Sequence, residues 1–130
     1  MILWNEEYST GNPTIDKQHR LLFQFVNDME EVYQEGHAES WLMTGFNFLK
    51  SYAQAHFGYE EDCMLRSHCS VAEQNHKAHG AFLEKITKAE LALIEKGYSP
   101  QAFEELHRYL ESWITGHIMA LDRRLKENSS

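Results

Sequence analysis

The chain has 130 residues, of which 25% are charged, and its formal net charge is −8. This length suits a single domain, residues 1–130, with a core large enough to fold without disulfides or a structural metal. The acidic balance argues against nucleic acid and anionic membranes as partners, because both need a basic face on the protein.

Residues 1–15 are predicted to form an extended N-terminal arm and a turn, because they include glycine, asparagine and Pro13 in succession. A first helix is expected over about residues 16–36, where apolar side chains recur at three- and four-residue steps before a glycine stop. A second helix is expected over about residues 39–65, on the same periodic grounds.

A third helix is expected over about residues 70–96, where Ser70 and Glu73 have the spacing of a capping box. The fourth is expected over about residues 99–126, with Ser99 as a cap residue before a proline. Three short connections between four long helices favour antiparallel neighbours. The sequence therefore predicts an all-α, up-down-up-down four-helix bundle.

Histidine and carboxylate interrupt the apolar stripes of these helices. His56 and Glu60 are four residues apart, so they project from one face of the second helix. Such a pair alone is common by chance and is usually a hydrogen-bonded surface pair. His79 and His117 stand on the apolar faces of the third and fourth helices, and His19 stands on that of the first. An inward imidazole from each helix favours a metal over four separate core histidines.

The residue types on these stripes restrict the metal. Neutral imidazoles with carboxylates suit iron, zinc or copper, and the lack of thiolates argues against a structural zinc site. Carboxylates can bridge two cations, which makes a dinuclear centre the favoured interpretation in a bundle core. Iron is the leading candidate.

Several motifs, taken in chain order, resemble those of the hemerythrin family, particularly the bacterial hemerythrins, over essentially the whole chain. They are W-x-x-x-Y-S-x-G-x-P-x-I-D-x-Q-H from Trp4 to His19, H-F-x-x-E-E from His56 to Glu61, H-x-x-F from His79 to Phe82, and W-x-x-x-H-I-x-x-x-D from Trp113 to Asp122. The resemblance implies an oxo- or hydroxo-bridged centre of two iron ions.

The resemblance also implies the metal ligands. They are His19 and His56 on one iron, His79 and His117 on the other, and Glu60 and Asp122 as bridges. Asp122 is nominated by the resemblance alone, because five residues beyond His117 it would lie about 140° round a continuous helix. Glu61 is expected to be exposed, or to contact a ligand without binding the metal itself.

One position departs from the family pattern. The family usually has a second histidine four residues before His79, where this chain has Asn75, with His76 next to it. Either the register is intact and one iron has a histidine fewer, or His76 replaces it through a local adjustment of the helix. We favour the first, because His76 would have to move about 100° round the helix. An absent histidine should open a coordination position to water, an anion or a substrate.

Three functions follow from the resemblance. The preferred hypothesis is a non-haem di-iron domain that binds dioxygen or small anions at the iron and acts as an oxygen or redox sensor. It would be the regulatory part of a larger signalling protein, with an output domain attached at the C-terminus. The alternative is a stand-alone oxygen carrier, and the third reading is a di-iron oxidase or peroxidase. Because a carrier or sensor needs no catalytic base, no catalytic residue is assigned and the chain is not expected to be an enzyme.

The cysteines and the hydropathy pattern indicate the cellular compartment in which the protein is found. Cys63 and Cys69 are a poor disulfide framework, and no stretch has the pattern of a transmembrane span or a signal peptide. We therefore expect a cytoplasmic protein.

Overall fold

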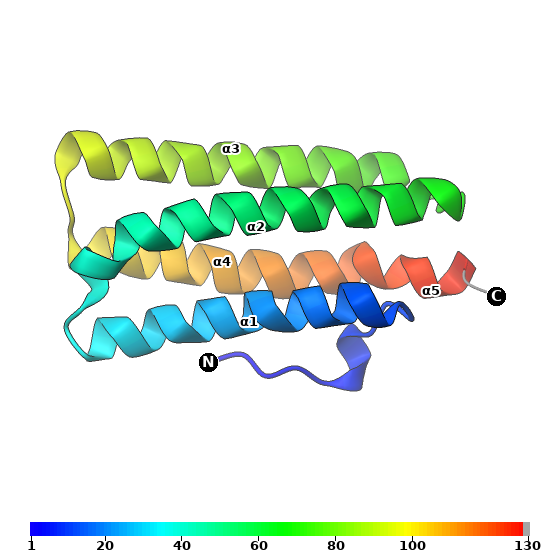
Figure 1. Cartoon of the computed structure of the whole chain (residues 1–130), viewed down its shortest axis with the longest axis horizontal. Helices are drawn as coiled ribbons and strands as arrows, with labels where there is room; N and C mark the ends of the chain where they lie inside the picture. Colours follow the sequence, from blue (N-terminus) through cyan, green and yellow to red (C-terminus); the bar gives the residue numbers. More distant parts are fainter. Residues whose placement is uncertain (129–130) are drawn as a thin grey trace.

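The computed structural model describes residues 1–128. Four long helices run alternately up and down along one bundle (Figure 1). They are α1 (Pro13–Gln34), α2 (Ala38–Arg66), α3 (Ala72–Lys96) and α4 (Pro100–Ala120). Three short elements flank them: η1 (Glu6–Tyr8), η2 (Asp122–Arg124) and α5 (Leu125–Asn128). The described residues contain no strand, so the predicted four-helix bundle is confirmed. None of their helices has the length and apolar character needed to cross a membrane.

The N-terminal arm lies along α1. The backbone N–H of Ile2 donates to the Asn27 side chain at 2.9 Å, and the Asn27 amide donates back to the Ile2 carbonyl at 2.8 Å. Farther along the arm, the rings of Trp4 and Tyr8 pack edge-on against Phe23, with centroids 5.6 and 5.0 Å away. The arm therefore covers part of the α1 surface, as Figure 1 shows for the segment leading from the N-terminus.

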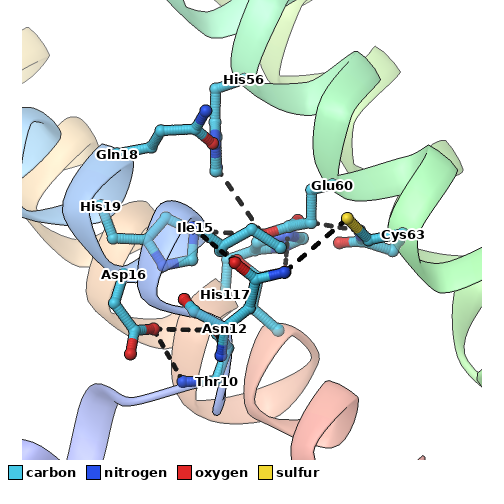
Figure 2. Close-up of polar contacts among 12 residues, drawn as sticks. Thr10, Asn12, Ile15, Asp16, Gln18, His19, His56, Glu60, Cys63 and His117 are labelled. Atoms are coloured by element: carbon cyan, nitrogen blue, oxygen red, sulfur yellow. Dashed lines mark hydrogen bonds and ion pairs between the residues drawn. The ribbon is translucent and has the colours of Figure 1, made fainter. Parts of the chain in front are cut away.

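Helix α1 begins at Pro13, three residues before the predicted start. The Asn12 side chain accepts hydrogen bonds from the first turn, and a proline at the first helical position costs no hydrogen bond. The Asp16 carboxylate then accepts from the backbone N–H and the hydroxyl of Thr10, each at 2.8 Å (Figure 2). It also accepts from the hydroxyl of Ser9 at 2.8 Å. These contacts fix the first turn of α1, one turn ahead of its histidine.

Helix α3 begins at Ala72, and its N-cap residue Val71 makes no side-chain hydrogen bond. The capping box predicted from Ser70 and Glu73 is therefore wrong. Val71 and Cys69 are buried in an apolar cluster, whereas Ser70 is exposed. Burial of the two apolar neighbours of Ser70 decides where this helix starts, and the local capping preference does not.

Helix α4 ends at Ala120, earlier than the expected end near residue 126. Leu121 is the C-cap of α4, with φ −119° and ψ −54°, and the tighter helix η2 begins at the next residue. The break turns Asp122 into the bundle, where it is 1% exposed. A continuous helix would have left that carboxylate on the flank.

The buried apolar residues form two clusters of unequal size. The larger fills most of the bundle, and the smaller contains Ile15, Met64, Cys69, Val71 and Leu125. The smaller cluster gathers residues from the end where α1 and α3 begin and α2 and α4 end. On α1, His19 lies between Ile15 of the smaller cluster and Leu22 of the larger one. The other three helices follow the same order, so the predicted site forms a polar layer between two apolar regions.

Candidate metal centre

Six buried polar side chains meet in this layer, which we call the cluster. Each is between 0 and 8% exposed, although all six carry a polar or ionisable group: His19, His56, Glu60, His79, His117 and Asp122. They come from α1, α2, α3, α4 and η2. Figure 2 shows His19, Glu60 and His117 converging beneath His56. The structure thus brings together all six residues that the sequence nominated as ligands.

Glu60 lies between imidazoles from three helices. Its Oε2 lies 3.1 Å from Nε2 of His19 and 3.6 Å from Nε2 of His56. Its Oε1 faces the other way and lies 3.2 Å from Nε2 of His79. The two oxygens of one carboxylate therefore face different histidines, as in a bridging ligand.

The carboxylate of Asp122 is arranged in a similar way. Its Oδ2 lies 3.2 Å from Nε2 of His19, and its Oδ1 lies 3.0 Å from Nε2 of His117. The Nε2 atoms of His117 and His79 are 3.1 Å apart. Two carboxylates thus lie between two pairs of imidazoles.

The donor atoms fit a pair of cations better than a network of hydrogen bonds. Two groups could each hold a metal ion, and they share Glu60: one is Glu60, His79, His117 and Asp122, and the other is His19, His56 and Glu60. Oδ1 of Asp122 forms no hydrogen bond despite its closeness to His117. Donor atoms around an octahedral cation with bonds of about 2.1 Å lie about 3 Å apart, which matches these separations. Imidazole and carboxylate donors without thiolate are ligands that iron accepts.

Two residues outside the predicted set orient the histidines. Nδ1 of His56 donates to Oε1 of Gln18 at 2.6 Å, and Nδ1 of His79 donates to Oε2 of Glu61 at 2.9 Å. Both bonds leave Nε2 as the nitrogen that faces the cluster. Periodicity could not have found these partners, because each is the sequence neighbour of a cluster residue and lies about 100° round its helix. The signal for Gln18 was its place within the quoted Q-H motif.

Helix α3 places Asn75, and not His76, next to Glu60. Asn75 is 0% exposed, and its Nδ2 donates to Oε1 of Glu60 at 2.9 Å. The side chain of His76 is 73% exposed and contacts Glu61 instead. The structure agrees with an intact register, in which an amide takes the place of a histidine.

The charges of the cluster set the proton affinities of its histidines. Burial lowers the pKa of His19, but hydrogen bonds to Asp122 and Glu60 outweigh it and raise that pKa to about 9. Burial, followed by the charge of His19, lowers the pKa of His56 to about 3. The pKa of Asp122 is lowered: burial opposes this, but the nearby imidazoles of His117 and His19 prevail. Without a cation, the cluster therefore keeps a proton on His19 while His56 stays neutral.

Aromatic rings enclose the side of the cluster toward the larger apolar region. The Phe57 ring stacks on the His79 imidazole with centroids 3.8 Å apart and planes at 3°. The Trp113 ring stacks on His117 at 4.3 Å and 10°. These contacts fix the planes of two imidazoles and keep water from their faces.

Comparisons with known proteins agree with the geometry. The family model described as the hemerythrin HHE cation binding domain matches residues 10–127. The bacteriohemerythrin of Clostridium acetobutylicum is 28% identical over 127 residues, which are 95% of this chain and 97% of that protein. A bacteriohemerythrin of Pseudomonas aeruginosa is 23% identical over 117 residues, covering 90% of this chain and 74% of its own length. A hemerythrin-like protein of Naegleria gruberi is 20% identical over 123 residues, covering 95% and 89%.

Proposed function

Because this chain belongs to the hemerythrin family, we propose that it is a non-haem di-iron domain that binds dioxygen and acts as an oxygen or redox sensor. The observation that carries the proposal is the placement of Glu60 and Asp122. Each carboxylate turns its two oxygens toward different histidines. That arrangement suits two cations held side by side.

Each protein ligand has a distinct role in this proposal. His19 and His56 would hold one iron, His79 and His117 would hold the other, and the carboxylates of Glu60 and Asp122 would lie between them. An iron pair would supply the electrons for the reaction with dioxygen, which side chains alone cannot do. The protein provides a dry enclosure, because all six ligands are buried and Phe57 and Trp113 cover two of the imidazoles.

Two features support sensing over transport. Asn75 donates to Glu60 in place of a histidine ligand, which lowers the number of imidazoles on one iron. Asp122 lies between the end of α4 and the start of α5. A shift of this carboxylate on oxidation or ligand binding would move the short helices that follow it. The sensor would pass such a movement to a signalling partner on its C-terminal side.

A stand-alone oxygen carrier is the second candidate. The match to the Clostridium protein covers 97% of that protein, which therefore contains little more than one such domain. A carrier needs the same iron pair but must release dioxygen unchanged. The two functions thus differ in what happens after dioxygen binds.

Anaerobic reconstitution with Fe²⁺, followed by metal analysis and exposure to air, tests the proposal. We expect about two iron ions per chain and rapid conversion to a stable ferric form, as suits a redox sensor. An absorption band that disappears on removal of dioxygen would favour the carrier. Sustained turnover with a reductant or peroxide would favour an enzyme, and fewer than about one iron per chain would exclude the dinuclear centre.

A further inference from the structure

Glu61 connects a buried histidine to an exposed one. It follows Glu60 on α2, and its side chain is 22% exposed. Oε2 of Glu61 accepts a hydrogen bond of 2.9 Å from Nδ1 of His79. Its Oε1 accepts a short hydrogen bond from Nδ1 of His76, whose side chain is 73% exposed. A single carboxylate therefore extends from the protein surface to a ligand of the cluster.

The corresponding histidine of the other pair has a neutral partner. Nδ1 of His56 donates to the side-chain amide oxygen of Gln18. The backbone carbonyl of Gln18 also accepts a hydrogen bond of 3.1 Å from the Tyr52 hydroxyl. A carboxylate that accepts from the far nitrogen makes an imidazole a stronger metal ligand than an amide does. Its negative charge draws the Nδ1 proton more strongly, which leaves more electron density on the ring for Nε2 to donate. The two cation positions are thus supported unequally.

We propose that Glu61 is a positioning residue for the cation held by His79 and His117. It keeps the proton on Nδ1 of His79, strengthens Nε2 as a donor and offsets the histidine that Asn75 replaces. His76 holds Glu61 in this position. The inference rests on the di-iron function proposed above and assigns to Glu61 the task of retaining one particular iron.

The surroundings of His79 separate this role from a role in folding. Phe57 stacks on the imidazole at 3.8 Å and fixes the plane of the ring without help from Glu61. His79 is 2% exposed, whereas Glu61 lies at the edge of the bundle. Loss of the Glu61 carboxylate should therefore leave the ring in place but free to exchange its tautomer.

The experiment compares Glu61→Ala and Glu61→Gln with the unaltered protein and with Asp62→Ala. Asp62 is a suitable control because it neighbours Glu61, is exposed, and pairs with Arg66 at 3.0 Å. Competition with a chelator under anaerobic conditions measures the two Fe²⁺ affinities. We expect Glu61→Ala to weaken one of them about 10- to 100-fold and to leave the other unchanged. Glu61→Gln should weaken it less, because an amide oxygen still accepts from Nδ1, and Asp62→Ala should change neither.

Two further measurements identify the ligand that is affected. In the Zn²⁺-loaded protein, nitrogen NMR should show the His79 proton fixed on Nδ1, and Glu61→Ala should alter that signal while the His56 signal persists. Gln18→Ala should alter the His56 signal, leave the His79 signal unchanged, and weaken binding of the cation held by His19 and His56. His76→Ala should reduce the affinity of the His79 position, but less than Glu61→Ala does.

The results that would overturn the inference differ from those against the function. Two tightly held Fe²⁺ ions with an unchanged His79 signal in Glu61→Ala would show that Glu61 has no positioning role. Complete loss of one ion in His76→Ala, with none in Glu61→Ala, would show that His76 is itself a ligand. If the unaltered protein held fewer than about one Fe²⁺, the di-iron function itself would fail.

Discussion

Asn75 donates a hydrogen bond of 2.9 Å to Glu60, and its other amide atom, Oδ1, is buried without a hydrogen-bond partner. The family pattern has a histidine ligand at this position. At the position where the family's imidazole would face a cation, the Asn75 amide instead contacts the Glu60 carboxylate.

Asn75→His should restore the full set of histidine ligands and strengthen binding of the iron held by His79 and His117. We expect release of that iron to a chelator to slow about tenfold or more, and oxidation of the reduced protein in air to slow with it. Stopped-flow absorbance measures both. The control is Lys77→Gln, which alters an exposed residue of the same helix that pairs with Glu73 at the surface. Faster oxidation in Asn75→His would contradict the assignment of Asn75 to the vacant ligand position.

Asp122→Asn should loosen both cations, because Asp122 faces His19 with one oxygen and His117 with the other. An amide of the same size keeps one oxygen and loses the charge. We expect weaker binding of both Fe²⁺ ions, by about tenfold or more, with little change in helix content by circular dichroism. Retention of two iron ions at unaltered affinity would remove Asp122 from the ligand set.

Metal binding should release protons, because His19 has a pKa of about 9 and is protonated at neutral pH in the metal-free protein. A cation needs the Nε2 lone pair and therefore displaces this proton. Titration with Zn²⁺ in a weak buffer containing a pH indicator measures the release. It should be present at neutral pH and fall as the pH rises through about 9. A release that stays constant across this range would contradict the protonated state of His19.

The metal-free protein should lose stability on acidification below pH 6.5, because the pKa of His56 falls from 6.5 to about 3 on folding. Between these values the unfolded chain binds a proton that the folded chain excludes, so the free energy of unfolding decreases as the pH falls. His19 acts in the opposite sense: its contribution is complete below 6.5 and is lost as the pH rises toward about 9. Thermal unfolding of wild type and His56→Asn across this range tests the prediction. Equal slopes in the two proteins would contradict it.

The parts of the structure that follow helical periodicity could be predicted from the sequence. The four helices and the inward position of His19, His56, His79 and His117 depend only on residue spacing within continuous helices. Asp122 could not be found in this way, because the helix breaks at Leu121 and the following turn redirects the chain. Its nomination needed the resemblance to known proteins.

Contacts between helices were also beyond the reach of the sequence. A contact between Glu61 and a ligand was one of two expectations for that residue, but its partner could not be named. The histidines that Gln18 and Glu61 contact lie on other helices, 38 and 18 residues away along the chain. The start of α3 was misplaced for a similar reason. The packing of Cys69 and Val71 in the smaller apolar cluster outweighs the capping preference of Ser70.

The polar layer divides the interior of the bundle into a thick part, which holds the larger apolar cluster, and a thin part, which holds the smaller one. Beyond the cluster, the thin part is closed by few apolar residues, with Ile15, Met64 and Leu125 at its centre. Local opening costs less where fewer apolar contacts must be broken. Opening the thin part alone would uncover the ligands of all four helices while the thick part stays folded. We therefore expect iron to enter through this end of the bundle. Once bound, it would link all four helices and the C-terminal turn, and so oppose the opening that admitted it.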